Sequence, residues 1–239
     1  IDGGNLHNAI AREAYAVAGV KSKHKETVRV KLNHLLADMK DELKHTDPGV
    51  DITLESTDAP QEAIGAKTVK RLLRALTACP HGVIEMSRDI PGVVETSTNL
   101  ASVKMREHNV VEIGTSQRSL TESSKNNIVN TVTSVFKLAK AEVVSNDGYP
   151  GWKPNPESLV LKVAKDEYNS LYNKMPEVKV IHAGLECGLF LQKYPHLDMI
   201  SIGPTIRNAH SPDEKTEIAS VPIWWDFFVQ LLENMPEEK

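Results

Sequence analysis

A single histidine stands in a polar loop near the end of the chain. The stretch GPTIRNAHSPDEK (203–215) follows the apolar run DMISI, and it places His210 close to the carboxylates of Asp213 and Glu214. A neutral imidazole suits zinc, and a carboxylate can accept a hydrogen bond from the other nitrogen of a ligating ring. A catalytic zinc needs about three protein ligands. His210 is therefore either a metal ligand with partners elsewhere or an exposed loop residue without a role.

A second polar loop, HAGLECG (182–188), contains two glycines at the start of a predicted short helix. The free backbone amides of a helix start favour an anion such as a carboxylate, here beside Gly184. The alternative is a tight turn in which glycine serves shape alone. Glu186 is either a buried acid or a first-turn residue favoured by the helix dipole. Cys187 is predicted to be inert, because no Cys/His/Asn arrangement accompanies it.

The third candidate is Arg118, which ends the stretch VVEIGTSQRS (110–119) just ahead of a predicted helix. An arginine in this position can hold a carboxylate through a bidentate pair of hydrogen bonds. The alternative is an exposed arginine at the end of a strand. Asn8, near the start of the chain, suggests no site when it is considered alone.

The elements that position Arg118 are predicted from apolar periodicity. Apolar residues at helical spacing predict helices over 25–45 and 63–78, the second ended by Pro80 and Gly82. A capping box at Thr121 and Ser124 predicts the start of a third helix. The predicted strands are 9–17, 51–56, a hairpin of 96–104 with 109–118, and 141–145. A few strands alternating with long helices indicate one sheet covered on one face, an α+β sandwich.

A break follows at NDGYPGWKPNP (146–156), which has two glycines and three prolines. Beyond it, predicted helices (158–174, 185–194 and 222–235) alternate with apolar strands (178–183 and 198–203). This order indicates part of a parallel α/β sheet. Ligands bind such sheets at the carboxyl ends of the strands, and both polar loops leave those ends. The terminal helix is predicted to turn Trp224, Phe227, Phe228, Leu231 and Leu232 toward the core.

Composition narrows the class of protein. The 239 residues carry a formal net charge of -4 and no basic block suited to nucleic acid. No run reaches the roughly 18 apolar residues that a membrane span needs. Two cysteines fit a reducing compartment, so a soluble cytoplasmic protein is expected. The chain begins without methionine and directly enters an apparent strand, so we expect its first residue to be an internal cut.

Six segments together resemble the aminoacyl-histidine dipeptidases, also called Xaa-His dipeptidases or peptidase D. These are NAIAREA (8–14), VETSTNLASV (94–103), SQRSLTESS (116–124), YPGWKPNPES (149–158), HAGLECGLF (182–190) and DMISIGPTIRNAHSPDE (198–214). The family belongs to the di-zinc aminoacylase and carboxypeptidase superfamily. The resemblance covers essentially the whole chain, and it departs at Ala11, where the family has proline.

The resemblance implies a fold that is both α/β and α+β. The chain would supply the later part of an inserted α+β sandwich lid domain (1–147) and the C-terminal part of a parallel-sheet α/β catalytic domain (148–239). His210 matches the final metal ligand of the family. Arg118 and Asn8 match lid residues that hold the substrate, and Gly184 matches a loop position that contacts its backbone. No catalytic residue is expected in this chain, because the family's general base and other metal ligands lie upstream.

The implied function is metal-dependent hydrolysis of dipeptides, preferentially Xaa-His (carnosine-like) dipeptides, by a metal-bridged hydroxide. The complete site would hold two zinc ions, with manganese or cobalt as possible substitutes, and the enzyme would act on a small dipeptide as a homodimer. Two alternatives remain open. One is an aminoacylase or tripeptidase of the same superfamily, and the other is a non-catalytic lid or dimerisation fragment.

Overall fold

The computed structural model describes residues 1–7, 9–146, 148, 150–152, 155, 157–180, 186–209 and 213–236. Three of the predicted site residues, Asn8, Gly184 and His210, lie outside the described residues. The chain divides into two compact units, which are described one at a time. The first unit comprises Ile1–Leu73 with Ala101–Gly114, and the second comprises Arg74–Leu100 with Thr115–Lys239.

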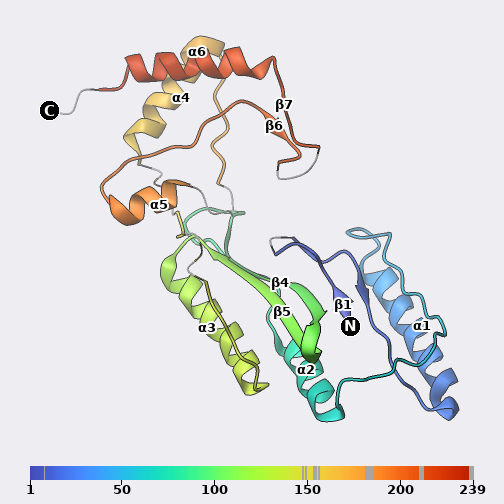
Figure 1. Ribbon diagram of the computed structural model, residues 1–239. Coiled ribbons are helices and arrows are strands. Elements are labelled where there is room, and N and C mark those ends of the chain that lie inside the picture. Colours follow the sequence, from blue (N-terminus) through green and yellow to red (C-terminus); the bar gives the residue numbers. More distant parts are fainter. Residues whose placement is uncertain are drawn as a thin grey trace. The chain divides into compact units, whose positions relative to one another are not determined.

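The first unit contains short strands and one long helix (Figure 1). Strand β1 (Asp2–Gly3) pairs antiparallel with β2 (Ala14–Tyr15) and with the distal part of β4 (Val94–Arg106). The 3-10 helix η1 (Ser22–His24) leads into α1 (Lys25–Glu42), as the apolar spacing predicted. No residue of α1 is buried, so its apolar stripe remains partly exposed to solvent.

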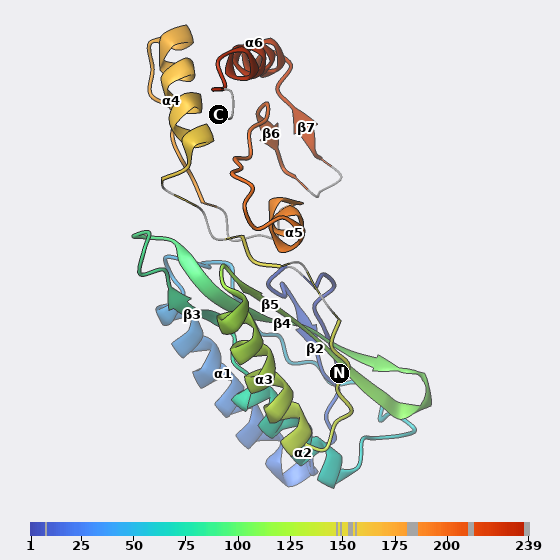
Figure 2. The same ribbon diagram turned by 90° about the vertical axis from the view of Figure 1, so that its left-hand side faces the viewer.

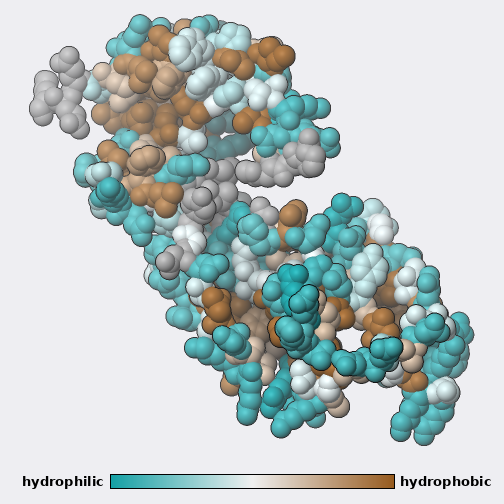
Figure 3. Space-filling view, viewed as in Figure 1, coloured by the Kyte–Doolittle hydropathy of each residue, from teal (hydrophilic) through white to brown (hydrophobic). Residues whose placement is uncertain are grey.

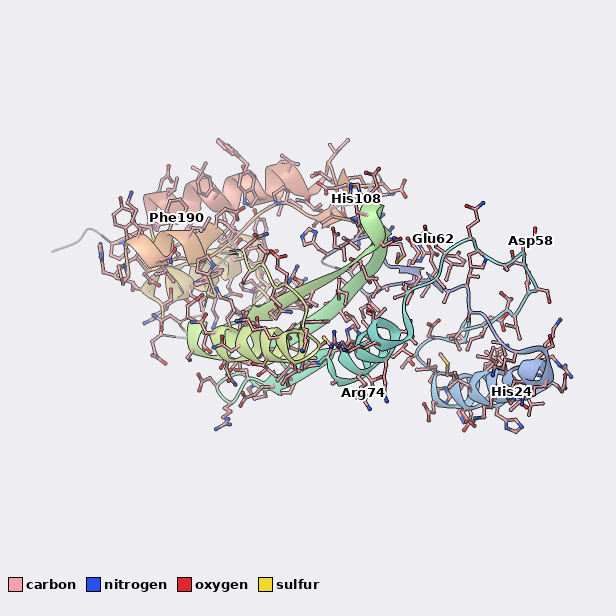
Figure 4. The ribbon with its side chains drawn as sticks, turned by 60° about the horizontal axis from the view of Figure 1, so that its bottom comes forward. His24, Asp58, Glu62, Arg74, His108 and Phe190 are labelled. Atoms are coloured by element: carbon pink, nitrogen blue, oxygen red, sulfur yellow. The ribbon has the colours of Figure 1, made fainter. Side chains whose placement is uncertain are left out.

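A hairpin of two long strands runs through both units. Strand β4 reaches the 3-10 turn η2 (Glu107–Asn109) and returns as β5 (Val110–Ser119), as predicted. Figure 4 shows His108 at this turn, where its φ of 60° lies in the left-handed region. In the second unit β4 also pairs with β3 (Gly82–Met86), a strand that was not predicted from the sequence.

Helices cover one face of this hairpin in the second unit (Figure 2). They are α3 (Glu122–Leu138) and the end of α2 (Ala66–Ala78). The residues that α3 buries, Ile128, Val132 and Phe136, recur at helical spacing and therefore form one inward stripe. The predicted sandwich of one sheet with one helical layer is thus present. The capping box is not, because Thr121 makes no side-chain cap bond.

The second unit also contains three helices after the proline-rich break. Helices α4 (Leu159–Tyr172) and α6 (Ser220–Glu233) pack through a small core of Ala164, Phe227 and Leu231. Tyr168 joins this core with its ring edge-on to Phe227, at 5.2 Å between centroids. Helix α5 (Glu186–Lys193) is short, and β6 (Ile206–Arg207) pairs antiparallel with β7 (Lys215–Thr216).

Four predicted strands are not strands in the structure. Residues 51–56, 141–145, 178–180 and 198–203 have no regular secondary structure, and of 9–17 only β2 forms. The remainder of the predicted strand 178–183 lies outside the described residues. A parallel strand takes its backbone hydrogen bonds from neighbouring strands, and all strand pairings with a defined register in the described residues are antiparallel. Within the described part of the chain, the apolar segments 178–180 and 198–203 therefore belong to no sheet.

The predicted core stripe of α6 was only partly right. Phe227 and Leu231 are 7% and 4% exposed, whereas Leu232 is 58% exposed. Figure 3 shows apolar side chains gathered on the surface of the part that contains α5 and α6. Within the described residues no helix is long and apolar enough to cross a membrane.

Candidate active site

Arg118 is the one predicted site residue that the described part of the chain contains. It is half-buried, next to the last residue of β5. Its two neighbours in sequence form side-chain hydrogen bonds to β4: Gln117 Nε2 donates to Thr98 Oγ1 at 3.0 Å, and the hydroxyls of Ser119 and Thr96 lie 2.9 Å apart. Arg118 thus lies between two cross-strand bonds that fix the register of the hairpin.

These bonds decide which face of the sheet Arg118 occupies. Thr96 and Thr98 are 2% and 3% exposed, so they point to the face that the helices cover. Successive side chains of a strand point to opposite faces, so Arg118 projects from the face that the helices leave open, as does Ser97 on β4. A guanidinium on such a face can meet the carboxylate of a bound molecule through two parallel hydrogen bonds.

The chain after Arg118 is held by a compact set of polar bonds. The Leu120 amide donates to the Glu95 carbonyl at 3.0 Å, and the Thr121 amide donates to Ser119 Oγ at 3.2 Å. Ser124 Oγ donates to Glu95 Oε1 at 2.9 Å. Ser124 therefore joins the first turn of α3 to β4, where the sequence predicted that it would cap its own helix.

Glu122 connects this helix start to the proline-rich segment. Its Oε1 accepts hydrogen bonds from Lys125 Nζ and from the Gly151 amide, both at 2.8 Å. Partial burial by itself would raise the pKa of Glu122. The two hydrogen bonds and the positive charge of Lys125 outweigh that effect and lower its pKa below the ordinary value. Glu122 is thus an ionised acceptor at neutral pH.

Two glycines make unusually close backbone contacts here. A Cβ on Gly151 would lie 2.7 Å from the Leu120 carbonyl oxygen and 2.8 Å from that of Ser119. A Cβ on Gly188, which is buried in α5, would lie 2.7 Å from the Pro150 carbonyl oxygen. The sequence left Gly188 as part of either an anion-binding helix start or a tight turn, and it predicted a domain boundary at 146–156. A close backbone approach leaves no mark in the sequence that could have distinguished these uses of glycine.

The histidine loop is the turn of a short hairpin. The backbone register pairs Ile206 with Thr216 and Arg207 with Lys215, and Arg207 also forms an ion pair with Glu217 at 3.3 Å. His210 lies outside the described residues. The hairpin explains how the ends of a polar loop are held together, and it was not predicted.

Asp198 fixes the segment that leads into this hairpin. Its Oδ2 accepts from the Val160 amide at 3.1 Å, in the first turn of α4. Burial would raise the pKa of Asp198, but the hydrogen bonds from the Ser158 hydroxyl and from the Val160, Leu159 and Met199 amides together lower it. Ser158 itself caps the helix by accepting from the Leu161 amide at 3.0 Å.

The described part of the second unit also contains two thiols and a cavity. Burial raises the pKa of the Cys79 thiol, and burial together with the Glu186 charge raises that of Cys187, so both favour the unreactive thiol form. A cavity of about 740 Å³ lies beside α4 and α6. Aliphatic and aromatic residues such as Leu161, Ile200 and Trp224 contribute much of its lining, and Arg118 does not reach it.

The described residues do not by themselves form a metal centre. Across the described ranges, no group of three or more histidine, cysteine, aspartate or glutamate side chains is arranged to hold an ion. Because His210 lies outside those ranges, its role as a ligand stays a prediction. The arrangement around Arg118 suits the binding and orientation of an anionic group, and no catalytic step through a metal is derived from it.

Comparison with known proteins gives three consistent findings. Residues 13–234 match the model of "Peptidase family M20/M25/M40". The chain is 41% identical over 235 residues to the cytosol non-specific dipeptidase of Escherichia coli (strain K12), covering 98% of this chain and 48% of that protein. The fold matches the crystal structure of an aminoacylhistidine dipeptidase from Vibrio alginolyticus with a TM-score of 0.88 and 38% identity, covering 100% of this chain and 48% of that one. The chain therefore spans about half the length of these relatives.

Proposed function

The chain belongs to peptidase family M20/M25/M40, and from this premise we propose that it takes part in the hydrolysis of dipeptides. The observation that carries the proposal is Arg118 on the open face of the β4–β5 hairpin, between the Thr96–Ser119 and Thr98–Gln117 bonds. A dipeptide has its free carboxylate close to the scissile bond. A guanidinium held in a fixed position can grip that carboxylate and orient the peptide.

The proposed substrates are dipeptides with a preference for Xaa-His. The names of the relatives support this proposal, because one is a non-specific dipeptidase and the other an aminoacylhistidine dipeptidase. Arg118 would bind the substrate carboxylate, with Asn8 and Gly184 as further contacts. The carboxylate contact alone does not distinguish a dipeptidase from an aminoacylase, because the substrates of both enzymes carry a free carboxylate. Recognition of the free amino end, which aminoacylase substrates lack, would make the distinction.

Metal dependence is part of the proposal, since peptidases of this family are generally metal-dependent. We infer that a complete site holds two zinc ions, replaceable by manganese or cobalt, with His210 as one ligand. A bound divalent ion supplies an activated water and polarises the peptide carbonyl. The general base and the other ligands are proposed to lie in the part of the relatives that this chain does not cover.

The assembly and location follow the same reasoning. We propose a lid domain up to about residue 147 followed by a part of the catalytic domain from residue 148, a homodimer as the assembly and the cytosol as the location. The E. coli relative is named a cytosol dipeptidase, which supports the location. The boundary at the proline-rich break is proposed from the sequence, because both of its sides, from Thr115 onward, belong to the same compact unit.

Hydrolysis assays on the protein at its natural length test the function. The substrates are Ala-His, Ala-Leu, the amide of Ala-His, N-acetyl-histidine and a tripeptide, each with zinc, manganese or cobalt supplied. The proposal expects cleavage of both dipeptides, Ala-His faster, and slow cleavage of the amide. Preferential cleavage of N-acetyl-histidine would indicate an aminoacylase. No cleavage of either dipeptide with any of the three metals would refute the proposal.

A further inference from the structure

Five residues form a contact point in the second unit, which we call the joint: Ser119 and Leu120 at the end of β5, Pro150 and Gly151 in the proline-rich segment, and Gly188 in α5. Arg118 directly precedes the joint on one side. On the other side lies α5 (Glu186–Lys193). The joint therefore connects the end of β5, which carries Arg118, to α5.

Both glycines are required for contact rather than for backbone conformation. Gly4 and Gly82 have φ values of +67° and +97°, which favour glycine whatever surrounds them. Gly151 and Gly188 have no such φ, so an alanine would be tolerated by the backbone at either position. The obstacle is space, because an added Cβ would lie 2.7 Å from the carbonyl oxygen of Leu120 or of Pro150. The absence of a side chain is what lets three chain segments touch.

A charged hydrogen bond holds the joint closed. The Gly151 amide donates to Glu122 Oε1 at 2.8 Å, and the same oxygen accepts from Lys125 at 2.8 Å. Glu122 begins α3, four residues after Arg118, so the bond ties the proline-rich segment to the element that continues from β5. Pro150 also contacts Gly188, so the same segment is in contact with α5.

We propose that Gly151 and Gly188 are positioning residues, which set the placement of Arg118 relative to α5 so that the guanidinium meets the substrate carboxylate. This inference rests on the proposed function. A Cβ at position 188 would push the Pro150 carbonyl away and draw the Gly151 amide from Glu122. A Cβ at position 151 would push directly on the backbone of Ser119 and Leu120, next to Arg118.

Hydrogen exchange at the Gly151 amide tests the joint without any activity measurement. We expect Gly188→Ala to speed exchange at Gly151 at least about tenfold, because the amide loses its acceptor more often. If Gly188→Ala does not fold, Glu122→Ala provides the test instead. It removes the acceptor of the Gly151 amide and leaves the glycine contacts intact, so it should speed the same exchange. Gly148→Ala is the control, because nothing lies within 4 Å of a Cβ there. Equal exchange in the Gly188→Ala and Gly148→Ala proteins would overturn the joint.

The positioning role is tested by the ratio of kcat/KM for Ala-His to that for its amide, measured on the protein at natural length. Gly151→Ala and Gly188→Ala should lower this ratio toward the value of Arg118→Ala, while Gly148→Ala keeps the wild-type ratio. A loss shared equally by both substrates would mean a structural role only and would overturn the inference. If the unsubstituted protein cleaves no dipeptide, the proposed function fails, and the exchange measurement alone decides whether the joint exists.

Discussion

The hydroxyls of Thr96 and Ser119 lie 2.9 Å apart on the buried face of two neighbouring strands. Thr96 is 2% exposed and Ser119 is 8% exposed. Because side chains alternate between the faces of a sheet, a slip of one residue between β4 and β5 would turn Arg118 toward the helices. This pair, with Thr98 and Gln117, therefore decides that Arg118 faces away from the helical layer.

Removing one hydroxyl of this pair should destabilise the protein. Thr96→Val keeps the shape of the side chain but removes one of the two partners of the Ser119 hydroxyl and leaves only the bond from the Thr121 amide. The free energy of unfolding should therefore fall by about 1–3 kcal/mol. Urea unfolding measures the loss. Ser119→Ala in the Thr96→Val background should cost less than it does alone, and additive costs would contradict the pairing. Thr68→Val, at an exposed position of α2, is the control and should change stability by less than about 0.5 kcal/mol.

Arg118→Ala should weaken the binding of substrates through their carboxylate. We expect KM for Ala-His to rise about 10- to 100-fold, as for the loss of a charged hydrogen-bonded contact, with a much smaller change for its amide. Arg118→Lys should recover part of the affinity only, because an ammonium cannot form the bidentate pair. Arg88, which is 86% exposed at its side chain, provides the control Arg88→Ala. Equal losses on the acid and the amide would exclude the carboxylate contact.

His210→Ala should lower the metal content and the activity together, because the proposal makes His210 a metal ligand. Elemental analysis of the protein at natural length, after removal of loosely bound ions, measures the metal per chain. We expect Arg118→Ala to retain the full metal content despite its lower activity, and the exposed His34 gives the control His34→Ala. A His210→Ala protein with unchanged metal content would rule out the ligand role.

Asp198 should make stability depend on pH. Its pKa is lower in the folded protein than its ordinary value of about 3.9. Its contribution is therefore fully present above that ordinary value and is lost as pH falls through the lower, folded pKa. Asp198→Asn should remove this component, so the free energies of unfolding of variant and wild type should converge as the pH falls below about 4. Asp166→Asn, on the exposed side of α4, is the matched control for the substitution itself.

Two adjacent leucines of α6 should differ in their contribution to stability. Leu231 is 4% exposed in the core with Ala164 and Phe227, so Leu231→Ala should cost about 2–5 kcal/mol. Leu232 is 58% exposed, and Leu232→Ala should cost less than about 1 kcal/mol. Denaturant unfolding of the two variants gives the comparison. Similar costs would mean that Leu232 is covered in the protein in solution.

The helices were the most predictable part of the fold. The apolar spacing of α1, α2 and α6 comes from residues only a few positions apart, so it is present in the sequence itself. The β4–β5 hairpin was predictable for the same reason, since its two strands are joined by a short turn. The strands at 178–180 and 198–203 were not confirmed, because a strand exists only when another segment supplies its hydrogen bonds.

The sequence by itself determined the residue types that can do chemistry, their order, and the family resemblance that the matches of the whole chain bear out. It also determined that Arg118 ends a strand. Only the tertiary structure decided which face Arg118 occupies, because that depends on register bonds to Thr96 and Thr98. Likewise, only the structure separated Gly151 and Gly188 from glycines that serve turns, because a contact with a distant carbonyl oxygen is a property of the folded chain.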